Sequence, residues 1–174
     1  MITHYNGRTW QKIESGTTTN INDIWGINNS QENKSLVLAT VSSRYHLGDY
    51  KLLSVSPNSA NDYVNWPYTR LYGVWFQDER NIFISGNGAY VDKNNTLEEI
   101  SLPTNAFLTR VRGNGQNDIY IAGCCNTLIH YNGSNWQLIN GVYGNYEGMD
   151  VKGNLAAVVG WTGNQAIIVM LKGQ

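Results

Sequence analysis

Short apolar runs that end in glycine recur along this chain at a constant spacing. The clearest three end at Gly86, Gly123 and Gly160, which are 37 residues apart. Each run is rich in β-branched and aromatic residues, as expected of a buried β-strand that enters a turn. The runs are Asn81–Gly86, Asp118–Gly123 and Leu155–Gly160, and Ser35–Thr40 is a less exact fourth copy. The equal spacing predicts a fold built from repeats of one structural unit.

Strand-like segments flank these runs in a fixed order. The glycine-ended runs are the second class in this order. First-class segments precede them: Ile21–Gly26, Leu71–Phe76, Leu108–Gly113 and Tyr146–Val151. Third-class segments follow them, Tyr50–Val55, Gly88–Asp92, Leu128–Gly133 and Ala166–Leu171, and fourth-class segments come last, Asp62–Trp66, Leu97–Leu102 and Asn135–Ile139. No unit contains the apolar periodicity over about 10–12 residues that a helical repeat needs. The pattern predicts an all-β fold, a β-propeller whose four-stranded antiparallel blades are about 37–50 residues long. About four such blades are expected, as a complete ring or as part of a larger one.

The predicted units divide one domain, residues 1–174. Residues 1–15 form a terminal hairpin from a partial blade, residues 16–66, 67–103 and 104–140 form blades, and residues 141–174 form an incomplete last blade. The hairpin consists of third- and fourth-class strands, whereas the last blade stops at its third strand. Residues 8–15 are therefore expected to pair beside Ala166–Leu171, within one chain or between the chains of a homodimer.

Two hairpins have nearly the same sequence. Ile2–Ile13 and Leu128–Ile139 both contain His-Tyr-Asn-Gly followed by Trp. An Asn-Gly pair favours a tight turn with positive φ, so each segment is predicted to be a β-hairpin whose Trp folds back over it.

These hairpins resemble degenerate Asp-boxes, the Ser/Thr-x-Asp-x-Gly-x-Thr-Trp turns of sialidase-like propellers. Thr3, Gly7, Thr9 and Trp10 match that pattern, while Tyr5 stands where the Asp is expected. The whole chain is similar to sialidase-like repeat proteins such as the photosystem II assembly factor propellers, as seen in Asp23–Gly26, Asn117–Gly123 and His130–Gly133. The resemblance implies a propeller fold and says little about function, because Asp-box turns are structural.

Composition narrows the partners. Charged residues make up 14% of the chain and the net charge is −1, so neither nucleic acid nor an anionic membrane is expected. The N-terminus lacks a basic region followed by an apolar run, so no signal peptide is predicted; a secreted or periplasmic parent stays open and the localisation unknown. Cys124 and Cys125 are adjacent and the three histidines are scattered, so two reduced thiols and no metal or cofactor are expected.

Aromatic and basic residues of the first-class strands are the candidate ligand-binding set, because these strands line the channel of a propeller. They are Trp25, Tyr72, Trp75, Arg110, Arg112 and Tyr146. Packing between blades is the role favoured for any one of these aromatics, whereas exposure at the channel mouth would let it stack on a ligand. Arg110 and Arg112 share one face of their strand, but the resemblance implies three arginines in a sialidase, so no catalytic residues are assigned. The sequence favours a non-catalytic binding or protein-interaction scaffold, with a glycan-binding lectin-like propeller and then a glycoside hydrolase as alternatives. A protein or a neutral glycan is the expected partner.

Overall fold

The computed structural model describes residues 1–29, 34–43, 48–64 and 69–172, and these residues form seventeen strands and no helix. The prediction of an all-β fold is confirmed. Accordingly, this part of the chain contains no helix long and apolar enough to cross a membrane.

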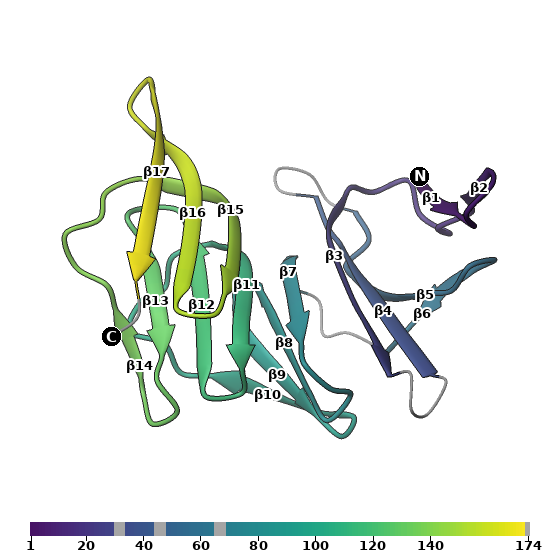
Figure 1. Cartoon of the computed structure of the whole chain (residues 1–174), viewed down its shortest axis with the longest axis horizontal. Helices are drawn as coiled ribbons and strands as arrows, with labels where there is room; N and C mark the ends of the chain where they lie inside the picture. The colour runs from purple at the N-terminus through teal and green to yellow at the C-terminus, as the bar shows by residue number, and fades with distance from the viewer. Residues whose placement is uncertain (30–33, 44–47, 65–68, 173–174) are drawn as a thin grey trace.

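Four antiparallel sheets follow one another along the chain after an N-terminal hairpin (Figure 1). The N-terminal hairpin is β1 (Ile2–Tyr5) and β2 (Trp10–Ile13). Sheet 1 consists of β3 (Ile21–Asn29), β4 (Lys34–Val41), β5 (Lys51–Val55) and β6 (Ala60–Asp62). Sheet 2 consists of β7 (Leu71–Phe76), β8 (Asn81–Gly86), β9 (Gly88–Lys93) and β10 (Thr96–Ile100). Sheet 3 consists of β11 (Leu108–Gly115), β12 (Asp118–Gly123), β13 (Leu128–Tyr131) and β14 (Trp136–Leu138), and sheet 4 of β15 (Asn145–Lys152), β16 (Leu155–Thr162) and β17 (Gln165–Lys172).

The strand predictions hold best in the middle of the chain, where β7, β8 and β12 have the predicted bounds. Sheet 1 departs from the prediction in two places. Strand β6 ends at Asp62, where the predicted strand began, and residues 65–66 of that prediction lie outside the described residues. The copy of the glycine run is also shifted by one, because Val41, rather than Thr40, pairs with the inner strand as Gly86 does.

The repeated glycines are explained by a close backbone approach. A Cβ atom at Gly86, Gly123 or Gly160 would lie 1.9, 2.4 or 1.9 Å from a carbonyl oxygen at the start of the first strand of the same sheet. No side chain fits at such distances without moving the backbone. The spacing of 37 residues therefore records a packing requirement that each of these three sheets repeats.

The first strands of the four sheets, β3, β7, β11 and β15, are here called the inner strands, and each contacts the next. All four have a register shift at the same position, which leaves Asn22, Tyr72, Thr109 and Glu147 as the extra residues. Two of these link neighbouring sheets directly: the Asn22 amide donates to the Leu71 carbonyl at 3.0 Å, and the Thr109 hydroxyl to the Tyr146 carbonyl at 2.6 Å. The bulges thus turn polar side chains from one sheet towards the next.

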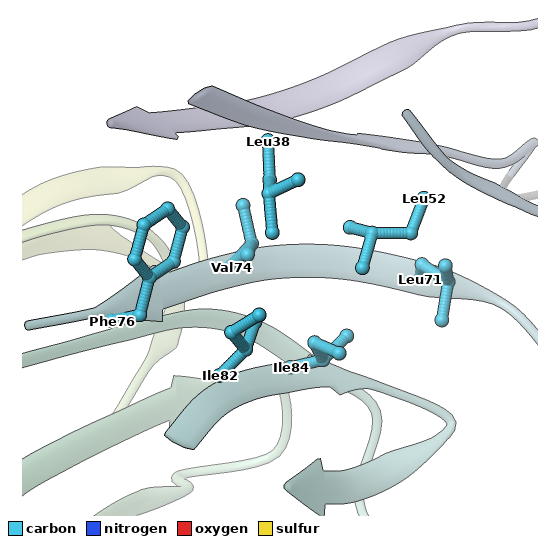
Figure 2. Close-up of a cluster of buried hydrophobic side chains, with 7 residues drawn as sticks. All are labelled: Leu38, Leu52, Leu71, Val74, Phe76, Ile82 and Ile84. Atoms are coloured by element: carbon cyan, nitrogen blue, oxygen red, sulfur yellow. The ribbon is translucent and has the colours of Figure 1, made fainter. Parts of the chain in front are cut away.

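Apolar side chains fill the space between successive sheets. Figure 2 shows Leu38 and Leu52 of sheet 1 pointing towards a row of side chains on β7 and β8 of sheet 2, where Leu71, Val74, Phe76, Ile82 and Ile84 lie. Similar clusters lie between sheets 2 and 3 and between sheets 3 and 4. Sheets 2 and 3, which have a neighbouring sheet on each side, are therefore covered on both faces.

The N-terminal hairpin lies beside sheet 1, on the far side of the molecule from sheet 4 (Figure 1). Among the described residues, strand β2 pairs with β1 alone, so the expected pairing of residues 8–15 with Ala166–Leu171 does not occur within this chain. Pairing between two chains stays a prediction.

Candidate binding surfaces

Arg112, one of the predicted ligand-binding residues, is buried and connects three inner strands, β3, β7 and β11, by hydrogen bonds. Its two terminal nitrogens donate to the two carboxylate oxygens of Asp23, each at 2.8 Å, with side chains only 11% and 7% exposed. Nη1 also donates to the carbonyls of Val74 and Val111, and the guanidinium lies 4.9 Å from the centre of the Trp25 ring. A bidentate, buried pair of this kind fixes geometry, and loss of one partner would leave a buried charge unpaired.

Arg110 does not join Arg112 in a shared site. It is half-buried, and its Nη1 donates to the carbonyl of the preceding residue, Thr109, at 2.8 Å. Because the Asp23 carboxylate neutralises Arg112, the two arginines do not present a joint pair of free cations. A joint pair of free arginines was the only sequence feature that favoured a hydrolase, and the structure therefore gives less support to that alternative.

The two tryptophans of the predicted set pack between sheets. Trp75 is 3% exposed and belongs to the cluster between sheets 2 and 3. Trp25 is half-buried, and its indole nitrogen donates to the Phe76 carbonyl at 2.8 Å. The ring centres of Trp25 and Trp75 are 6.5 Å apart. Their surroundings suit the packing role better than ligand stacking, and their ligand-binding role stays a prediction.

The two predicted tyrosines differ in exposure. Tyr146 is fully buried in the cluster between sheets 3 and 4, its hydroxyl has no described hydrogen-bond partner, and burial raises its pKa. Tyr72 is half-buried, and its ring meets the edge of Phe107 with centres 5.1 Å apart. Of the six predicted residues, only Trp25, Tyr72 and Arg110 keep partial solvent access. None of the six lines the hollows formed by the described residues below.

Sheet 4 has an apolar face that no segment of the described ranges covers. Burial alternates along β16 from Leu155 to Trp161 and along β17 from Ile167 to Lys172, and the inward set packs on sheet 3. The outward set includes Val159, Trp161, Ile168 and Met170, which are 45%, 39%, 72% and 57% exposed. Val159 and Ile168 face each other across the two strands, as do Ala157 and Met170. These outward residues are here called the open face of sheet 4.

The sequence contains a pattern that indicates this exposed apolar face, although the sequence-based prediction of binding residues did not include it. Residues 166–171 read Ala-Ile-Ile-Val-Met-Leu without polar alternation. A continuous apolar run is typical of a strand buried on both faces, whereas a strand with one solvated face alternates. The outward half of the run therefore indicated a surface that needs cover.

Sheet 1, the first of the four sheets, is incompletely covered on the face that points away from the other sheets. On the face away from sheet 2, Ile24 is 48% exposed. A cavity of about 380 Å³ lies between this face and the N-terminal hairpin, and its lining includes Ile2, Ile13, Val37 and Val55. The hairpin covers this face only in part.

A second hollow lies between sheets 2 and 3. This groove has a volume of about 370 Å³ and combines aromatic side chains with amides and carboxylates, among them Phe83, Tyr131, Trp136, Asn81, Asn117 and Glu99. Tyr131 and Trp136 stack with centres 4.9 Å apart. Aromatic faces next to amide groups are suited to sugar rings.

One cluster of ionisable groups lies outside these surfaces. His130 Nε2 is 2.8 Å from Asp118, and the imidazole stacks on Tyr120 with ring centres 4.2 Å apart. Burial, followed by the neighbouring Asp118 carboxylate, raises the pKa of Tyr120. Across the described ranges, no three His, Cys, Asp or Glu side chains come close enough to hold a metal ion.

Comparison with models of known protein families gives no match, and neither does comparison with curated proteins.

Proposed function

We propose that this protein is a non-catalytic interaction scaffold, that its four sheets are consecutive blades of a β-propeller, and that it binds a second copy of itself through the open face of sheet 4. The carrying observation is that Val159, Trp161, Ile168 and Met170 remain exposed on one face of a regular sheet. Covering large apolar side chains of this kind is worth roughly 1–2 kcal/mol each. Contiguous exposed apolar side chains mark interaction sites in soluble proteins.

The propeller interpretation is supported by the repeated relation between neighbouring sheets. Each inner strand contacts the next, and the second strand of each sheet also contacts the next inner strand. The bulge, the glycine approach and the apolar filling recur with this relation. A series of sheets related in this way curves around an axis at the inner strands.

A second copy is the partner that fits both ends of the series. The open face of sheet 4 corresponds to the face through which sheets 1, 2 and 3 each meet the following sheet. The partly covered side of sheet 1, around Ile24, corresponds to the face that meets a preceding sheet. Two chains related by a two-fold axis would join sheet 4 of each to sheet 1 of the other, making two equivalent interfaces.

The test uses Ile168→Lys and Ile24→Lys, which place a charge on opposite sides of the proposed interface. Each variant alone should lose dimer in sedimentation experiments, because both interfaces of its homodimer carry the change. An equimolar mixture should regain association, because one of its two interfaces is then unaltered. Leu138→Lys, at a 39% exposed residue of the outer strand β14, is the matched control and should associate like the wild type.

Circular dichroism verifies that each variant remains folded. Association that survives Ile168→Lys, or a mixture that does not recover, would contradict the proposal.

Glycan binding is the second candidate, and the groove between sheets 2 and 3 favours it. Asn117 and Glu99 lie in this groove beside the Tyr131–Trp136 stack. A panel of neutral oligosaccharides tested by calorimetry, with Asn117→Ala as the groove variant, checks this candidate. Binding that Asn117→Ala weakens would support it, and absence of heat across the panel would exclude it for those sugars.

A further inference from the structure

The two adjacent cysteines occupy the turn between β12 and β13. Their Sγ atoms are 3.0 Å apart, with the thiol of Cys125 donating to that of Cys124. Cys125 is exposed and Cys124 is half-buried, and both are free thiols. A reagent can therefore reach Cys125 from solvent, while Cys124 is held against its sulfur.

The backbone of this turn is held in an uncommon conformation. Cys125 and Asn126 both have left-handed φ angles, 60° and 64°, and the Thr127 amide donates to the Cys124 carbonyl at 3.1 Å. A left-handed conformation is unfavourable for Cys unless its surroundings impose it. Here the contacts with neighbouring segments impose it.

Those contacts join the turn to the segment that enters sheet 4. The Cys125 amide donates to the Asn145 side-chain oxygen at 3.0 Å, and the Asn126 amide to the Gly144 carbonyl at 2.9 Å. In return, the Gly144 amide donates to the Asn126 side-chain oxygen at 2.9 Å. The cysteine turn is thus clamped against residues 144–145 by three hydrogen bonds, which fix the backbone that carries the two sulfur atoms.

We propose that Cys124 and Cys125 are a reversible redox modification site that closes to a disulfide by exchange with a small-molecule disulfide such as oxidised glutathione. The Cys125 thiolate attacks the S–S bond of glutathione disulfide, and one glutathione thiolate leaves. The sulfur of Cys124 then attacks Cys125 in the mixed disulfide, forming the ring and releasing the second glutathione. Two protein thiols are oxidised, one glutathione disulfide is reduced to two thiols, and the two protons pass to water or to the glutathione thiolates.

The exchange has a defined dependence on pH. The hydrogen bond from Cys125 to Cys124 raises the pKa of the Cys125 thiol. Only the thiolate attacks a disulfide, so the rate should rise as pH increases towards this raised pKa and fall in neutral and acidic solution. A strained ring between adjacent residues is also readily reduced, which suits a reversible modification.

Intact-mass measurement after equilibration in glutathione redox buffer tests the site. The wild type should become two hydrogens lighter without retaining glutathione. Cys124→Ser should instead retain one glutathione on the exposed Cys125, and Cys125→Ser should react slowly because Cys124 is half-buried. In denaturant, the equilibrium constant for ring closure should fall by about tenfold or more, because the clamp is lost.

Amide hydrogen exchange supplies a second readout, since closure should change protection at Asn126 and Gly144. A wild-type protein that accumulates the same glutathione adduct as Cys124→Ser, forms only disulfide-linked dimers, or closes equally well when unfolded would overturn the proposal. These thiols take no part in the open face of sheet 4, so either proposal can fail without the other.

Discussion

Two hairpins with almost the same sequence have the same local structure and different surroundings. In β1–β2, Tyr5 pairs with Trp10 and their rings are 5.1 Å apart; in β13–β14, Tyr131 pairs with Trp136 and the rings are 4.9 Å apart. The turn glycines have φ angles of 92° and 89°, as predicted for the Asn-Gly pairs. Yet Trp10 is 70% exposed, whereas Trp136 is half-buried against the cluster between sheets 2 and 3.

The difference separates what a short sequence encodes from what the rest of a sheet adds. An asparagine side chain fixes each turn, because Asn6 and Asn132 both accept from the amides two and three residues later. Strand β13 also pairs with β12, whereas β1–β2 is a two-stranded sheet. An isolated two-stranded hairpin is marginally stable in water. The hairpin geometry is therefore local, and its stability comes from neighbouring sheets.

The tryptophans should give the largest contrast. Trp136→Ala removes a ring packed on the core, and we expect a loss of about 3 kcal/mol in the free energy of unfolding. Trp10→Ala removes an exposed ring and its contact with Tyr5, worth about 0.5–1 kcal/mol. Chemical denaturation of both variants measures the difference. Equal losses would mean that the two rings are equally buried in solution.

The turn glycines should give a smaller contrast. Both have positive φ, so alanine is strained at either position by about 1 kcal/mol. At Gly133 the new Cβ would also lie 3.0 Å from the Asn117 Cβ, while nothing lies within 4 Å at Gly7. We expect Gly133→Ala to lower the melting temperature more than Gly7→Ala. The reverse order would refute the assigned packing.

The histidines should give the smallest contrast. His130 bonds to Asp118 and stacks on Tyr120, whereas the buried Nδ1 of His4 has no described partner. His130→Gln should therefore cost about 0.5–1 kcal/mol. His4→Gln should lie within about 0.5 kcal/mol of the wild type. Comparable losses for the two variants in urea denaturation would show that the Asp118 contact contributes nothing.

Sequence reasoning succeeded where the signal is local or repeated and failed where it depends on distant partners. The strands, the Asn-Gly turns and the glycine spacing all follow from patterns within a few residues or one repeat. The Asp23–Arg112 pair joins residues 89 positions apart in the chain, so no periodicity indicates it. The same strand prediction left open whether Trp75 lines a channel or fills the core, because alternation assigns a residue to a face but not to what covers that face.

The same contrast between similar sequence patterns in different surroundings exists between whole sheets. Sheets 2 and 3 are apolar on both faces and covered on both, whereas sheet 4 is apolar on both and covered on one. Its residue pattern is that of an interior sheet. We propose that a second copy of the chain supplies the missing cover.

Light scattering on the wild-type protein over a range of concentrations tests this claim most directly. The chain has a mass of 19.5 kDa, and we predict a concentration-dependent rise towards twice that value. A constant mass of 19.5 kDa at every concentration, with the tryptophan fluorescence of the protein unchanged on dilution, would contradict it.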